Sequence, residues 1–102
     1  MAIVDEDVER YATEHTSPRS DELSSVASET EREQPDAQMM VGRLEGTFLE
    51  MLVHATRAER VLEIGTFTGY SALSMATALA PGGRITSLEV DPEHAAIARR
   101  NI

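Results

Sequence analysis

Residues 60–91 decide the fold, and they read RVLEIGTFTGYSALSMATALAPGGRITSLEVD. The segment from Val61 to Ile64 is short, apolar and followed by a glycine, which is typical of a buried strand. Residues 71–80 are rich in Ala, Leu and Met, which favour a helix, and the Pro-Gly-Gly that follows them ends it. Residues 85–90 then predict a second strand. A strand, a crossover helix and a strand of these lengths predict a parallel βαβ unit with a right-handed connection.

Carboxylates flank the turn between the first strand and the helix. Glu63 stands at the end of the first strand and Glu89 at the end of the second, on the edge where open α/β sheets bind ligands. Gly65 and Gly69 bracket a tight turn whose backbone can approach a ligand closely, and N–H groups at a helix start suit an anionic group. A carboxylate at the position of Glu89 can accept both hydroxyls of a ribose. The residues alone therefore predict a ribose-bearing ligand with an anionic end.

The same turn resembles a family motif. The segment Leu62–Ser71 is similar to the first motif of the caffeoyl-CoA type of S-adenosylmethionine-dependent O-methyltransferases, and residues 45–49, EGTFL, resemble the EG-x-FL helix before its first strand. The resemblance covers residues 37–102 strongly and the N-terminal helices weakly. It implies an α/β, Rossmann-like class I methyltransferase fold, of which this chain holds the N-terminal helices and the first βαβα portion.

The resemblance also implies which residues bind S-adenosylmethionine. Glu63 matches an acid near the methionine end of the cofactor, with an exposed strand-end carboxylate as the alternative. Glu89 matches the ribose-binding acid, where many relatives carry Asp, and Val90 would pack near the adenine. Ser71 matches a hydroxyl partner of the cofactor carboxylate, although a simple hydrogen bond at the helix start is an alternative. Backbone atoms of Val41 and of the turn would supply the other contacts. The cofactor-binding residues expected from the resemblance are Val41, Glu63, Gly65, Thr66, Gly69, Ser71, Glu89 and Val90.

Other residues near this turn have simpler interpretations. Phe67 and Tyr70 are expected to be packing residues, and Met39 and Met40 to fill gaps in the core. No two of the three His residues have the spacing of metal ligands, so the sequence predicts no catalytic His and no metal site.

Three further helices are expected before the first strand. The first two are amphipathic and lie in residues 1–36, an acidic N-terminal region whose residues 29–36 read as a linker. The third runs from about residue 41 to 55, with a wide apolar face. Gly42 and Gly46 inside it each cost about 1 kcal/mol relative to Ala, unless close packing or ligand approach requires them. The apolar stripes are Val4, Val8, Tyr11 and His15 in the first helix, Leu23, Val26, Ala27 and Thr30 in the second, and Leu44, Phe48, Leu49, Leu52 and Val53 in the third.

Length and composition limit what the chain can do by itself. At 102 residues it is one small domain at most, divided here into an N-terminal region, 1–36, and the start of a cofactor-binding domain, 37–102. A full fold of this type needs roughly twice this length, so we expect the N-terminal part of a larger protein or a truncated product. A sheet of two parallel strands would also leave edges and an apolar face uncovered.

Net charge and the lack of recognisable targeting signals limit which partners and which location are expected. The net charge is −9, of which −8 falls in residues 1–36, so nucleic acid is a poor partner. No apolar run is long enough to span a bilayer, so no membrane partner is expected. Cys is absent and no secretory or mitochondrial leader is recognisable, so we expect a cytoplasmic location. In the resembling family the N-terminal helices contribute to a dimer, so a homodimer is expected.

These observations leave three hypotheses. The first is the cofactor-binding half of an O-methyltransferase that acts on a small hydroxylated acceptor such as a catechol. The second is a nicotinamide-dependent Rossmann enzyme, against which the spacing argues because residues 65–69 do not read G-x-G-x-x-G. The third is a non-catalytic fragment that dimerises or folds with a partner. Under the first hypothesis the catalytic base is unknown and the chain alone is inactive. Any divalent metal would be bound by residues outside this chain.

Overall fold

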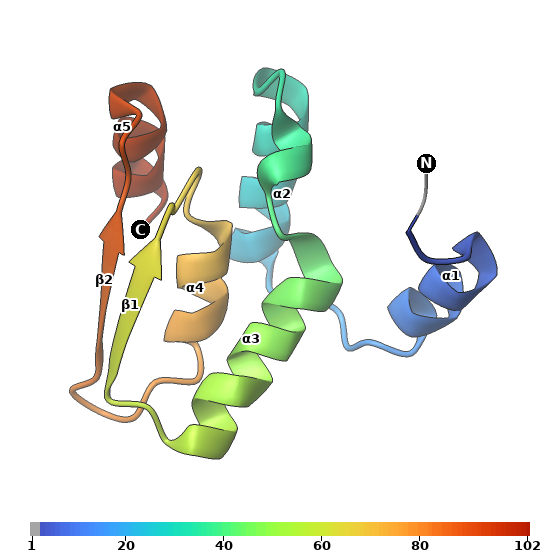
Figure 1. The fold of residues 1–102 in the computed structure, drawn as a ribbon, viewed down its shortest axis with the longest axis horizontal. Coiled ribbons are helices and arrows are strands. Elements are labelled where there is room, and N and C mark those ends of the chain that lie inside the picture. The colour runs from blue at the N-terminus through green and yellow to red at the C-terminus, as the bar shows by residue number, and fades with distance from the viewer. Residues whose placement is uncertain (1–2) are drawn as a thin grey trace.

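The computed structural model describes residues 3–102 and confirms the α/β architecture (Figure 1). β1 and β2 pair in parallel, and α4 forms the crossover between them. The outer limits differ slightly from the prediction, because α4 ends at Ala76 and β2 at Leu88. The elements in order are α1 (Glu6–Glu14), α2 (Asp21–Glu33), the 3-10 helix η1 (Ala37–Met39), α3 (Gly42–Thr56), β1 (Arg60–Ile64), α4 (Tyr70–Ala76), β2 (Arg84–Leu88) and α5 (Pro92–Asn101).

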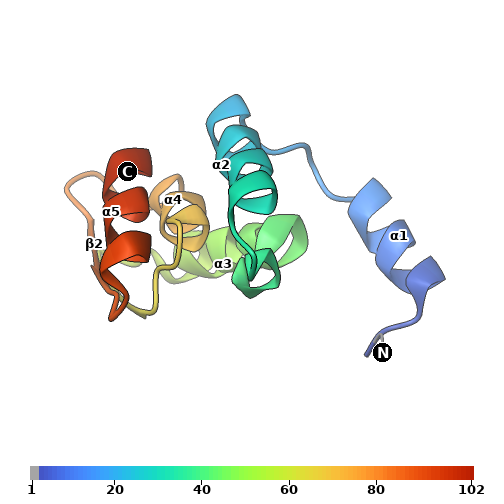
Figure 2. The ribbon, with the colours of Figure 1, turned by 90° about the horizontal axis from the view of Figure 1, so that it is seen from above.

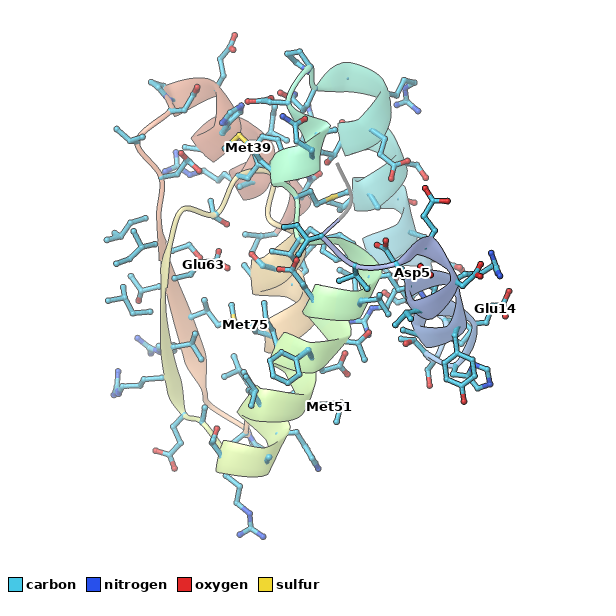
Figure 3. The ribbon with its side chains drawn as sticks, turned by 45° about the vertical axis from the view of Figure 1, so that its right-hand side comes forward. Asp5, Glu14, Met39, Met51, Glu63 and Met75 are labelled. Atoms are coloured by element: carbon cyan, nitrogen blue, oxygen red, sulfur yellow. The ribbon has the colours of Figure 1, made fainter. Side chains whose placement is uncertain are left out.

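The two faces of the sheet have opposite environments. The register pairs Glu63 with Ser87, and both side chains lie on the face that α4 covers, with Glu63 buried. Figure 3 shows Glu63 on the side of the strands where the helices lie. Leu62, Ile64 and Leu88 point to the other face and are exposed. The uncovered apolar face expected of two parallel strands is therefore present, and the buried environment expected for the first strand holds on one face only.

The two N-terminal helices pack differently. Leu23 and Val26 of α2 form a buried cluster with Tyr70, the first residue of α4. In contrast, α1 lies at the edge of the molecule at the end of an extended connection, where its main helix contacts are with α3 (Figures 1 and 2). Residues 6–14 are all described, and none of them is buried. The stripe predicted for α2 is thus confirmed as a packing surface, while the stripe predicted for α1 remains open to solvent.

Helix ends follow the local sequence signals. The hydroxyl of Ser20 accepts a hydrogen bond from the backbone N–H of Leu23, as expected of an N-cap. Asp5 caps α1 in the same way through the N–H of Asp7. The linker expected at residues 29–36 is shorter, because α2 continues to Glu33. In the last turns of α2 Thr30 is buried, and Glu29 forms an ion pair with Arg100 of α5.

The glycines of α3 have separate roles. A Cβ on Gly46 would lie 2.8 Å from Ser74 Oγ and 2.9 Å from Tyr70 Cε1, so close packing against α4 requires glycine there. Gly42 has a φ of +75° and is the first residue of the helix, so it is not an interior glycine as the sequence suggested. The wide apolar face is only partly covered, since Val53 is buried but Phe48 and Leu52 are exposed.

Candidate functional site

The turn from Gly65 to Gly69 connects β1 to α4 in an unusual backbone conformation. Gly65 and Gly69 have φ values of +87° and +97°, which explains why glycine stands at both positions. Between them Phe67 also has a positive φ, +51°, which is uncommon for a residue with a bulky side chain. No local pattern in the sequence predicts that strain. Such a conformation persists only where surrounding contacts hold it.

Glu89 is one of those contacts. One of its carboxylate oxygens accepts a hydrogen bond from the backbone N–H of Phe67 at 2.8 Å, and the other accepts one from Asp91 at 3.1 Å. The hydrogen bond from Asp91 is the largest cause of a lowered pKa for Glu89, and that from Phe67 and the nearby His94 lower it further. The carboxylate is therefore charged at neutral pH and anchors the turn to the end of β2.

Glu63 lies beneath the turn and joins its two sides. Its carboxylate accepts a hydrogen bond from the Ser71 hydroxyl at 2.5 Å and another from the Ser87 hydroxyl at 3.0 Å. The side chain is buried, so the alternative of an exposed strand-end carboxylate is wrong. The Ser71 hydroxyl donates to Glu63, and its contact with a cofactor stays a prediction.

Two hollows meet at Gly65. The smaller, of about 40 Å³, lies between the turn and the segment before α3, and Ser71 opens onto it. The larger, of about 420 Å³, lies over the ends of both strands. The predicted residues that line them are Val41, Gly65, Thr66 and Ser71 for the smaller hollow, and Gly65, Glu89 and Val90 for the larger.

Glu63 and Gly69 are not among the residues that line these two hollows in the described part of the chain. Glu63 supports Ser71 from below, as its hydrogen bond shows. Gly69 faces α5, where an added Cβ would lie 3.3 Å from Ile102 Cγ1 and 3.5 Å from Ala98 Cα. For Gly69 the structure thus shows a packing role, and its contact with a cofactor stays a prediction.

Sequence reasoning missed several residues around the turn. Met39 is exposed and lines the smaller hollow together with Met40, so the core role expected for Met39 is wrong. Ser87 was also missed, although aligning the ends of the two strands would have placed it opposite Glu63. Phe67 and Tyr70 are buried, as expected, and Phe67 packs edge-on against His94 with ring centroids 4.7 Å apart.

Residues 3–102 hold neither a metal-binding cluster nor a membrane-spanning helix. No cluster of three or more His, Cys, Asp or Glu side chains is placed to hold a metal ion within that range. No helix in the same range is long and apolar enough to cross a membrane.

Comparisons with known proteins agree with the fold. The first class that emerges is the Rossmann-like methyltransferases: the chain superposes on a Bacillus cereus O-methyltransferase in complex with SAH with a TM-score of 0.84, at 36% identity over 94% of this chain and 43% of that one. It also superposes on a SAH-bound Podospora anserina methyltransferase with a TM-score of 0.88, at 27% identity over 99% of this chain and 45% of that one.

The family can be stated more narrowly. The O-methyltransferase family model matches residues 13–102, so the chain belongs to the O-methyltransferase family. Among curated relatives, a catechol O-methyltransferase of Niastella koreensis is 48% identical over 57% of this chain and 26% of its own length. A catechol O-methyltransferase of Mus musculus is 32% identical over 89% of this chain and 34% of its own length. The chain therefore spans about a quarter to a third of these relatives.

Proposed function

We propose that this chain is the S-adenosylmethionine-binding part of an O-methyltransferase that acts on a small hydroxylated acceptor such as a catechol. The observation that carries the proposal is the turn, where Gly65 joins a hollow beside Ser71 to a hollow beside Glu89 and Val90. Bound S-adenosylmethionine would supply an activated methyl group for the acceptor oxygen. Solved relatives whose complexes contain SAH or SAM support the same cofactor here.

The described residues fit such a cofactor in three respects. A Cβ on Gly65 would meet no described atom within 4 Å, so the backbone there faces open space. The buried hydroxyl of Thr66 has no hydrogen-bond partner within residues 3–102, and a ligand at the turn would supply one in addition to the backbone contacts of this residue. Val90 is 97% exposed and supplies an apolar surface beside Glu89. These are the features that a polar nucleoside with a flat apolar base needs.

Each residue then has a role in holding the cofactor. Glu89 would accept the ribose hydroxyls while keeping its bond from Phe67, and Val90 would contact the adenine. Gly65, Thr66 and Val41 would contact the methionine portion through backbone atoms, with Gly69 keeping the turn closed. Ser71 would donate to the cofactor carboxylate, and Glu63 would orient Ser71. Residues 37–102 form this unit under the proposal, and residues 1–36 form the acidic N-terminal region, whose helix α2 packs against it.

Calorimetric titration with SAH tests the proposal. The chain should bind SAH, and Glu89→Ala should weaken binding by 10- to 100-fold or more, because hydrogen bonds to a charged group contribute about 1.5–3 kcal/mol each. Glu31→Ala is the matched control, because Glu31 is an exposed carboxylate on α2. Tight binding of NADH with no binding of SAH would overturn the proposal in favour of a nicotinamide enzyme.

The proposal extends to a cytoplasmic homodimer. The exposed apolar side chains of Val4, Val8 and Tyr11 on and before α1 are the surface that a second copy would cover. Because residues 1–36 carry a net charge of −8, association should strengthen as salt screens the repulsion. Sedimentation velocity at increasing salt should show a dimer that Val8→Glu removes, whereas Glu9→Gln on the same helix should retain it. A monomer under all conditions would contradict this part.

A further inference from the structure

The turn is held by an element outside the βαβ unit. Thr68, the fourth residue of the turn, is only 1% exposed, and its side chain contacts Thr30 of α2, with the two hydroxyl oxygens 2.9 Å apart. Thr30 is itself 2% exposed and lies 38 positions earlier in the chain. Figure 1 shows the turn after β1 lying between α2 and α5. A hydrogen bond between two hydroxyls this deeply buried is shielded from competition by water.

The hydroxyl protons of the pair can be assigned. The Thr30 hydroxyl also lies 2.7 Å from the carbonyl oxygen of Val26, which can only accept a hydrogen bond. Each hydroxyl has one proton, so Thr30 donates to Val26 and the Thr68 hydroxyl donates to Thr30. Thr30 is therefore the acceptor that satisfies the buried hydroxyl of Thr68.

A second contact fixes Thr68 from the opposite side. The side-chain amide of Asn101, in α5, donates to the backbone carbonyl of Thr68 at 2.9 Å. Arg100 of α5 also forms an ion pair with Glu29 of α2. Thr68 is thus held between two helices, and it stands next to Phe67, whose positive φ needs external support.

We propose that Thr30 is a positioning residue for the cofactor turn, acting through Thr68 to keep Phe67 and its neighbours in the strained conformation. The inference rests on the proposed function for its consequence, which is cofactor affinity. It makes the second N-terminal helix a working part of the site, and not only a cover over it. Thr30 would not touch the cofactor itself.

The test uses variants of the whole chain and two measurements. Thr30→Val removes the acceptor while keeping the side chain's shape, and should speed amide hydrogen exchange in residues 65–69 about tenfold. Exchange in β1 and β2 should increase by less than exchange in the turn. The SAH dissociation constant should rise by about tenfold as well. Thr30→Ser keeps the hydroxyl and should behave like the unaltered chain. Thr56→Val removes a hydroxyl bonded to a helical carbonyl four positions earlier, away from the turn, and is the control.

A double variant decides whether the two threonines act on each other. Thr68→Val alone should also loosen the turn, because it removes the same bond from the other side. In the Thr30→Val/Thr68→Val protein the same bond can be lost only once, so exchange and affinity should change no further than in the more affected single variant. Losses that simply add in the double variant would overturn the proposal, as would unchanged exchange in Thr30→Val.

The two measurements separate this inference from the proposed function. Hydrogen exchange is measured without ligand, so it reports on the role of Thr30 even if the unaltered chain does not bind SAH. Failure of the unaltered chain to bind SAH would count against the proposed function alone. If Thr30→Val does not fold, Thr68→Val decides the question in its place: a folded Thr68→Val chain with faster exchange in residues 65–69 supports the proposal, and one with unchanged exchange overturns it.

Discussion

The two N-terminal helices begin alike and end in different environments. Both α1 and α2 have an acidic first turn and a side-chain N-cap, and both were predicted from apolar residues at helical spacing. Yet α2 has three buried residues, Leu23, Val26 and Thr30, whereas none of the residues of α1, all of which are described, is buried. Figure 2 shows the separation of α1 from the other helices.

The difference teaches what helical periodicity does and does not predict. Spacing identifies which side of a helix is apolar, but the partner that covers it is set by contacts distant in sequence. For α2 that partner is Tyr70 at the start of α4, so the helix is tied to the turn. For α1 the described chain supplies no comparable cover. The helix that packs should therefore be sensitive to substitution, and the helix that does not should tolerate it.

The largest expected effect is at the core of α2. Leu23→Ala should lower the free energy of unfolding by about 2–5 kcal/mol, because it removes a fully buried side chain and leaves a cavity. Val8→Ala, on the exposed stripe of α1, should change it by less than about 0.5 kcal/mol in the monomer. Urea unfolding followed by circular dichroism, at low protein concentration, measures both. Similar losses for the two variants would show that α1 is packed as tightly as α2.

A second substitution tests how tightly α3 packs against Tyr70, the residue of α4 that α2 covers. Gly46→Ala places a methyl group 2.9 Å from the Tyr70 ring and 2.8 Å from Ser74, so Tyr70 must move. The overpacking should cost about 1–3 kcal/mol, despite the better helix propensity of Ala. Glu45→Ala, at the exposed neighbouring position, is the control. If Gly46→Ala were as stable as the unaltered chain, the contact between α3 and α4 would be looser than the structure shows.

The elements that sequence predicts well here are those with local causes. The βαβ unit follows from apolar runs and glycines in residues 60–91, and the cap at Ser20 from a hydroxyl before two acids. The hydrogen bond of Thr30 to Thr68 joins residues 38 positions apart, so no local pattern could predict it. The positive φ of Phe67 is equally invisible, because a phenylalanine normally avoids that conformation.

The candidate site was predictable in outline for a different reason. Glu63 and Glu89 end the two strands, and parallel strands bring their carboxyl ends to one edge. What the sequence could not predict is the environment of each carboxylate. Glu63 is buried between two serines, while Glu89 is held by backbone N–H groups. Those partners depend on strand register and on the shape of the turn.

A smaller effect is expected at the N-caps. Ser20→Ala should lower the free energy of unfolding by about 1 kcal/mol, because α2 is part of the cooperative core. Asp5→Ala removes the equivalent hydrogen bond from α1 and should reduce helix content while changing the global free energy by less than about 0.5 kcal/mol. Circular dichroism at low denaturant separates the two outcomes. Equal global losses would contradict the independence of α1.

The smallest effect on the free energy of unfolding should come from the ionisation of Tyr70, the residue against which α2 packs. Burial raises the pKa of Tyr70 above its ordinary value of 10.0, with the nearby Arg19 and Arg43 opposing the shift. The folded chain therefore keeps the phenol proton at pH values where the unfolded chain has lost it. The stability from this group is complete below pH 10 and is lost as pH rises from 10 through the raised pKa.

Tyr70→Phe isolates the contribution of phenol ionisation to stability, because it keeps the ring that packs on α2 and removes the ionisable group. The free energy of unfolding of the unaltered chain should fall more steeply above pH 10 than that of Tyr70→Phe, measured by urea unfolding at closely spaced pH values. Tyr11→Phe is the matched control, since Tyr11 lies on the exposed stripe of α1 and should leave the slope unchanged. Identical slopes for Tyr70→Phe and the unaltered chain would mean that α2 does not exclude water from the phenol, and the contrast between the two helices would be weaker than their burial indicates.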